Sequence, residues 1–275
     1  LEDVPGVGKT TTATAFARAL GLETRRVQFT SDTVPSDIIG FSVYDKDAGS
    51  FVYKPGAVMT NLLLADEINR TSSKTQSALL EAMEEYHVTV DGKTYPLPEP
   101  FVVLATQNPV GSAGTQLLPN SQLDRFLIRT TMGYPDAASQ INILKERHHE
   151  NPLDKISAVV TREQLLELIA QAGQTHIADA VYDYVVALVG CTRSDELIAL
   201  GISPRGALAL CRMAKACAFV RGRDYVTPED ITAVFSDVCA HRLVMSSKAR
   251  MQKISAQDAL NEILKRVPVP QIQER

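Results

Sequence analysis

The first residues of the chain have the composition of a phosphate-binding loop. The run 5–11 reads PGVGKTT, and helix-forming residues follow it. Glycines let backbone N–H groups converge on phosphate oxygens, Lys9 can reach the terminal phosphates, and the Thr10 hydroxyl can ligate Mg²⁺. The pattern therefore predicts ATP and Mg²⁺ as cofactors, although Asp3 stands where the motif usually has its first glycine. The residues expected to contact the nucleotide are Pro5, Gly6, Val7, Gly8, Lys9, Thr10 and Thr11.

Two carboxylates follow an apolar run further along the chain. Residues 62–65 are Leu-Leu-Leu-Ala, and Asp66 and Glu67 come directly after them. An Asp-Glu pair at the end of a strand is often only a solvated turn. After a phosphate-binding loop it has the form of a Walker B motif, in which Asp66 holds Mg²⁺ and Glu67 polarises the water that attacks the γ-phosphate.

Three more residues could respond to a nucleotide. Asn108 follows an apolar run and could bind the γ-phosphate or the attacking water, although an Asn before Pro is more often a turn residue. Arg125 ends a short helical segment, where it is either a surface ion-pair residue or an arginine finger for a neighbouring subunit. Arg205 lies in the first turn of an expected helix, where a cation is unfavourable unless an anion such as the γ-phosphate, or a local carboxylate, is near.

Charge and periodicity divide the chain into two units. Residues 1–154 hold 13 basic and 19 acidic residues, a net charge of −6, whereas residues 155–275 hold 15 and 13, a net charge of +2. Short β-branched runs alternate with helical segments in the first part, which predicts an α/β core with a parallel sheet at residues 1–150. The second part has repeated helix-start signals and no strand signals, which predicts an all-helical domain at residues 156–275. A polar, proline-containing break at residues 150–155 separates them.

The expected strands and helix starts are specific enough to be tested. An Asp91-Gly92 turn predicts a tight hairpin within residues 88–95, and a looser hairpin is expected at residues 41–53. The core strands are expected at residues 26–29, 61–65, 101–106 and 126–131. Helices of the second part are expected to start after Thr161, Ser203 and Thr227.

Composition narrows the classes of function. The net charge of −4 and the pI near 5.8 argue against a generally basic nucleic-acid binder. No apolar run approaches the roughly 18 residues that a membrane span needs. The four cysteines lack metal-ligand spacing, which argues against a metal or disulfide framework and favours a reducing, cytoplasmic setting.

Five segments in this order, LEDVPGVGKT, LLLADEINR, ATQNP, QLDRF and GISPRGALAL, resemble the MoxR family of AAA+ ATPases over nearly the whole chain. The resemblance implies an AAA+ core with a helix-2 insert at residues 41–53, a pre-sensor-1 hairpin at residues 88–97 and a C-terminal helical lid. Carried over by position, the functional residues are Lys9 and Thr10 (Walker A), Asp66 and Glu67 (Walker B), Asn108 (sensor 1), Arg125 (finger) and Arg205 (sensor 2).

The same resemblance implies a homo-oligomeric, hexameric ring that hydrolyses ATP and matures or activates partner proteins, among them proteins with von Willebrand factor A domains. The alternative is a nucleic-acid translocase or helicase-loader motor, against which the mixed or acidic tips of both hairpins argue. A non-hydrolysing scaffold and a small-molecule kinase are weaker alternatives, because Glu67 and Arg125 are both present. Family members also have elements before the loop that help to bind adenine. Almost nothing precedes Leu1, so either the chain is trimmed or its base pocket is incomplete.

Overall fold

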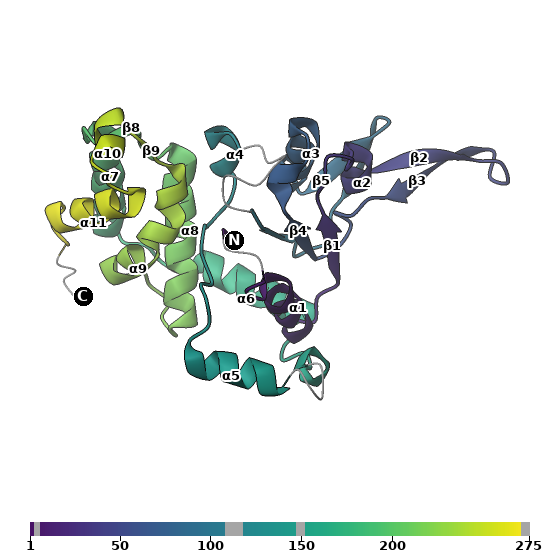
Figure 1. Cartoon of the computed structure of the whole chain (residues 1–275), viewed down its shortest axis with the longest axis horizontal. Coiled ribbons are helices and arrows are strands. Elements are labelled where there is room, and N and C mark those ends of the chain that lie inside the picture. The colour runs from purple at the N-terminus through teal and green to yellow at the C-terminus, as the bar shows by residue number, and fades with distance from the viewer. Residues whose placement is uncertain (3–5, 108–117, 147–151, 271–275) are drawn as a thin grey trace. The chain divides into compact units, whose positions relative to one another are not determined.

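The computed structural model describes residues 1–2, 6–107, 118–146 and 152–270 (Figure 1). Contacts group the chain into two compact units. The first comprises Leu1–Leu118 and Thr130–Leu166, and the second comprises Pro119–Arg129 and Glu167–Arg275. The predicted boundary at residues 150–155 lies partly outside the described residues and stays a prediction. Among the described residues, no helix is long and apolar enough to cross a membrane.

A parallel sheet forms the centre of the first unit. In the described residues its strands are β1 (Thr24–Gln28), β4 (Leu62–Asp66) and β7 (Val102–Ala105), in the order β1-β4-β7. The central strand, β4, is buried along its apolar residues, as expected for a strand with covered faces. Three of the four predicted core strands are thus confirmed.

Helix α1 (Lys9–Ala19) packs on this sheet. Its Ala13 and Ala17 are buried in one cluster with Leu62 and Leu64 of β4. Small side chains on that face of the helix bring its axis close to the strand, so the start of α1 is fixed relative to the end of β4.

Both predicted hairpins are present. They are β2 (Gly40–Asp45) with β3 (Ser50–Pro55), and β5 (His87–Val90) with β6 (Lys93–Pro96). Asp91 and Gly92 have φ angles of 50° and 76°, as a two-residue hairpin turn of this type requires. Figure 1 shows the long β2–β3 hairpin extending away from the parallel sheet of its own unit. The rings of Tyr53 and Tyr95 stack at 4.0 Å and join the two hairpins.

The predicted strand at residues 126–131 is wrong, since no strand is assigned to this segment. Its backbone groups bind elsewhere. The Phe126 carbonyl accepts from Arg242, and the Arg129 N–H donates to the Asp237 carbonyl at 2.9 Å. This apolar run thus satisfies part of its backbone with helical neighbours instead of a strand, and the Thr130 carbonyl accepts from the Glu2 N–H at 3.2 Å.

The second unit is helical, as predicted, apart from a two-stranded sheet of β8 (Ile198–Leu200) and β9 (Val244–Met245). Helix α6 spans the division between the two units. The helices are α4 (Asn120–Leu123), α6 (Arg162–Gln174), α7 (Asp179–Ser194), α8 (Pro204–Val220), α9 (Pro228–Cys239), η3 (Ala240–Arg242), α10 (Ser247–Met251) and α11 (Ala256–Arg266). The helix starts predicted after Thr161, Ser203 and Thr227 are confirmed. Leu188, Leu210 and Phe235 are fully buried at the centre of this unit.

Candidate active site

The loop before α1 is shaped by glycine backbone. Gly6 and Gly8 have φ angles of 87° and 93°, which side-chain-bearing residues rarely adopt. No described heavy atom lies within 4 Å of where a Cβ on either glycine would be. Glycine is therefore favoured at these positions by the backbone conformation and not by lack of space for a side chain. Gly8 is the N-cap of α1, whose first turn holds no acidic residue. Backbone N–H groups and the helix dipole therefore favour an anion here, as a nucleotide phosphate requires.

Lys9 and Asp66 come together in the first unit. Lys9 is the first residue of α1 and is only 8% exposed, and Asp66 is the last residue of β4. Asp66 accepts hydrogen bonds from Thr106 Oγ1 at 2.5 Å and from Arg26 Nη2 at 2.7 Å. Burial alone would raise the pKa of Asp66, but these hydrogen bonds and the charges of Arg26 and Lys9 hold it below its usual value. Asp66 is therefore an anion suited to Mg²⁺.

Glu67 leaves the strand through a left-handed backbone, with φ 58° and ψ 47°. Its N–H donates to Thr106 Oγ1 at 2.9 Å, which holds this turn against the end of β7. Its Oε2 atom accepts from Gln28 Nε2 and from Arg70 Nη1, each at 2.8 Å. The side chain is thus oriented by one residue of β1 and one of the turn after β4.

Sequence reasoning missed four of these partners, which are Arg26, Gln28, Thr106 and Arg70. The register of the parallel sheet brings the first three to the site, because Gln28 pairs with Asp66 and Ala65 pairs with Ala105. A polar residue at the end of each neighbouring strand is the signal that could have revealed them, since carboxyl ends of parallel strands meet at one edge.

Other predicted site residues either belong to the second unit or lie outside the described residues. Pro5 and Asn108 lie outside them. Arg125 and Arg205 are both exposed and belong to the second unit, where Arg125 follows α4 and Arg205 lies in the first turn of α8. Ser203 caps α8, because its Oγ accepts from the Gly206 N–H at 3.1 Å. The first unit thus brings together the Walker A and Walker B residues, and the second holds both arginines.

Comparisons with known proteins agree with this arrangement. A family profile described as "ATPase family associated with various cellular activities (AAA)" matches residues 1–128, and one described as "AAA lid domain" matches residues 191–263. The chain is similar to a crystal structure of a candidate ATPase from Cytophaga hutchinsonii. The TM-score is 0.91 with 38% identity, over 98% of this chain and 84% of that one. Fold and site therefore define an AAA+ ATPase with a C-terminal lid.

Two curated relatives give the family. The chain is 44% identical to the uncharacterised protein YeaC of Bacillus subtilis, over 98% of this chain and 84% of that protein. It is 42% identical to the chaperone MoxR1 of Mycobacterium tuberculosis, over 99% of this chain and 74% of that protein. The chain belongs to the MoxR family of chaperone-like AAA+ ATPases.

Proposed function

We propose that this protein hydrolyses ATP with Mg²⁺ in a homo-oligomeric ring in the cytoplasm, and that turnover remodels or activates partner proteins. The observation that supports this most is the Asp66–Glu67 pair at the end of β4, beside the glycine loop and Lys9. A scaffold that only binds nucleotide would have no use for a second, oriented carboxylate. A hexameric ring and a partner with a von Willebrand factor A domain are the family-based part of the proposal.

The residues of the first unit fit the proposed cofactors. The open, positive-φ glycines and the start of α1 would bind the phosphates, and Lys9 would contact their terminal oxygens. Thr10 and Asp66 would hold Mg²⁺, which when bound neutralises charge that develops on the phosphates. Remaining contacts of the nucleotide are assigned to the flanking loop residues Pro5, Gly6, Val7, Gly8 and Thr11.

Glu67 is the proposed base that orients and polarises the attacking water. In this structure its Oε2 atom accepts from Gln28 and from Arg70, so these two side chains orient the carboxylate that would accept a hydrogen bond from the water. Asn108 is proposed to position the same water or the γ-phosphate. Arg125 and Arg205 are proposed to stabilise the charge that develops on the transferred phosphoryl group.

ATP turnover per subunit, measured against protein concentration, tests the proposal. We expect specific activity to rise with concentration, because Arg125 would complete a neighbour's site only after assembly. Glu67→Gln should keep nucleotide affinity and lose turnover. Lys9→Ala should weaken the nucleotide itself by roughly tenfold to a hundredfold, since a charge-assisted hydrogen bond contributes about 1.5–3 kcal/mol.

The outcomes separate the alternatives. Binding of nucleotide without turnover at any concentration would reject the hydrolase and favour a scaffold. Turnover that is independent of concentration and of Arg125 would reject the shared site. Turnover stimulated by single-stranded DNA, and not by protein, would favour the nucleic-acid motor.

A further inference from the structure

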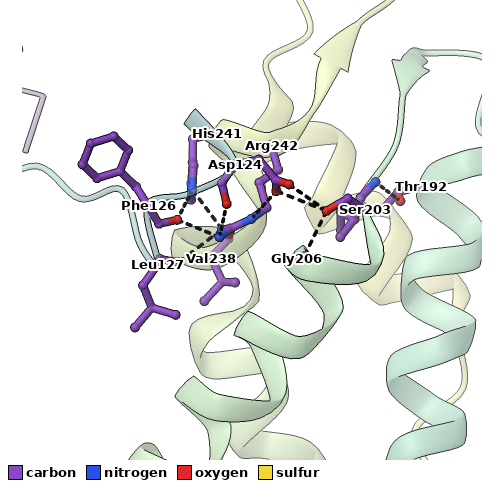
Figure 2. Close-up of polar contacts among 10 residues, drawn as sticks. Asp124, Phe126, Leu127, Thr192, Ser203, Gly206, Val238, His241 and Arg242 are labelled. Carbon is purple, nitrogen blue, oxygen red and sulfur yellow. Dashed lines mark hydrogen bonds and ion pairs between the residues drawn. The ribbon is translucent and has the colours of Figure 1, made fainter. Parts of the chain in front are cut away.

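A buried guanidinium lies beside the candidate finger. The side chain of Arg242, in η3, is only 2% exposed. Its Nε donates to Asp124 Oδ1 at 3.0 Å, and its Nη2 donates to the carbonyls of Asp124 at 3.2 Å and Phe126 at 2.6 Å. Nη1 donates to the Leu127 carbonyl at 3.2 Å (Figure 2). A single buried side chain therefore fixes the backbone on both sides of Arg125.

The neighbouring imidazole of His241 adds no second positive charge beside this guanidinium. His241 Nε2 lies 3.0 Å from the Phe126 carbonyl oxygen and 2.9 Å from Arg242 Nη1. Burial, and next the charge of Arg242, lower the pKa of His241 to about 4. At neutral pH the ring is therefore uncharged, and Asp124 is the carboxylate that faces the guanidinium.

The same carboxylate also binds the start of α8. Asp124 Oδ2 accepts from Ser203 Oγ at 2.9 Å, and Ser203 Oγ in turn accepts from the Gly206 N–H (Figure 2). A Cβ on Gly206 would lie only 2.8 Å from Arg242 Cδ, so α8 packs directly on the guanidinium stem. Arg205 directly precedes Gly206 in the chain, which places it next to this contact. Burial is the largest factor that lowers the pKa of Arg242, and the charge of Arg205 adds to it.

We propose that Asp124, Ser203 and Arg242 form a clamp that holds Arg125 and Arg205 as one rigid pair, so that both act on the same nucleotide. Asp124 is adjacent to Arg125, and Ser203 is two residues before Arg205. Asp124 and Arg242 are then positioning residues for hydrolysis, and this inference rests on the proposed function.

A purely stabilising role would not need this arrangement. A buried ion pair is often replaced by apolar residues without loss of stability. Here one carboxylate, directly after α4, contacts both the N-cap of α8 and η3. One exposed arginine, Arg125, follows this carboxylate in the chain, and the other, Arg205, lies in α8. Small displacements of such groups are costly in catalysis, because a misplacement of about 1 Å can cost about a hundredfold in rate.

The test compares Asp124→Asn with the matched variant Asp230→Asn. Asp230 is a carboxylate of the same unit, fully buried at the start of α9, and it pairs with Arg221 and Arg223. It contacts neither candidate arginine in the described interactions. Both variants are measured for Tm, for kcat and KM with ATP at saturating protein concentration, and for backbone hydrogen exchange.

For Asp124→Asn we expect kcat to fall by roughly tenfold to a hundredfold while KM changes by less than about twofold. In an Arg205→Ala background the same change should lower kcat by a smaller factor, because one of the positioned groups is already absent. Exchange should rise together at residues 125–127 and at Gly206. Asp230→Asn should lower Tm and raise exchange at the start of α9, with kcat kept at temperatures below its transition.

Gly206→Ala is a second route to the same result if Asp124→Asn does not fold. It separates α8 from Arg242 without changing any charge, and it should lower kcat in the same way.

Equal effects of Asp124→Asn and Asp230→Asn on kcat at matched Tm would overturn the clamp, as would additive effects with Arg205→Ala. Wild-type protein that never turns over ATP would reject the proposed hydrolase instead. Exchange would then still decide the clamp, which fails if only one of the two sites responds.

Discussion

Asp66 and Glu67 are adjacent in the chain, yet different residues orient their carboxylates. Asp66 accepts from Thr106 and Arg26, whereas the Glu67 side chain accepts from Gln28 at the end of β1. The two sets of partners are linked, because Arg26 Nη2 also donates to Gln28 Oε1 at 2.9 Å. A change of partner at Asp66 is therefore expected to reach the groups that orient Glu67.

The ion pair between Arg26 and Asp66 would compete with the proposed Mg²⁺ for this carboxylate. Because the Arg26 side chain is half exposed, the pair contributes about 0.2–1 kcal/mol. We expect Arg26→Ala to lower the Mg²⁺ concentration for half-maximal nucleotide binding by roughly twofold to fivefold, measured by Mg²⁺ titration with a fluorescent nucleotide.

Arg25→Ala is the matched control for this experiment. Arg25 lies on the same strand, where it pairs with Glu23 at 3.5 Å and donates to the Gly56 carbonyl at 3.2 Å. A requirement for more Mg²⁺ in Arg26→Ala, or the same change in both variants, would show that Arg26 does not compete with the metal.

Two glycines, Gly40 and Gly56, lie in close contact at the base of the β2–β3 hairpin. A Cβ on Gly56 would lie 2.3 Å from both the Gly40 nitrogen and the Ile38 carbonyl oxygen. The two chain segments at the base of the hairpin are therefore packed backbone against backbone, with no room for a side chain at Gly56. Any function of its exposed residues depends on this junction.

We expect Gly56→Ala to destabilise the protein by about 3 kcal/mol, because backbone atoms must move apart. Gly49→Ala, in the turn of the same hairpin, meets open space and costs only about 1 kcal/mol for its positive φ. Denaturant unfolding, with proteolysis of residues 41–54 as a local measure, compares the two. Equal effects would mean that the junction can relax.

Local sequence patterns predicted most helices and strands. The predictions that they missed depend on contacts between residues far apart in the sequence. Apolar alternation and turn residues predicted both hairpins, three core strands and the start of α8. Residues 126–131 carry the same strand pattern, but Arg242 and Asp237, over a hundred residues away, take their backbone hydrogen bonds. The same holds for the candidate site. Lys9 and Asp66 lie in contiguous sequence motifs and could be predicted, whereas Gln28 and Arg26 reach the site only through the register of β1 with β4.

In an assembled ring, the proposed finger predicts complementation between inactive subunits. Glu67→Gln and Arg125→Ala should each be inactive alone. In a mixture, an Arg125→Ala subunit keeps its own Glu67 and can receive an intact Arg125 from a neighbour. About a quarter of the interfaces in an equal, random mixture should then be active.

Steady-state turnover of the mixture measures this, and a second mixture is its control. Glu67→Gln with Lys9→Ala combines two defects of the same nucleotide site, so no interface regains both residues. Recovery in the control mixture, or none in the first, would place Arg125 outside the neighbour's site.

The left-handed backbone at Glu67 has a consequence for selection. Glycine and asparagine occupy φ 58°, ψ 47° with little strain, whereas glutamate there costs about 1 kcal/mol. A search for more stable variants would therefore favour either residue at this position, and each would remove the carboxylate. In the turn after β4, the sequence that folds best and the sequence that could perform chemistry are different sequences.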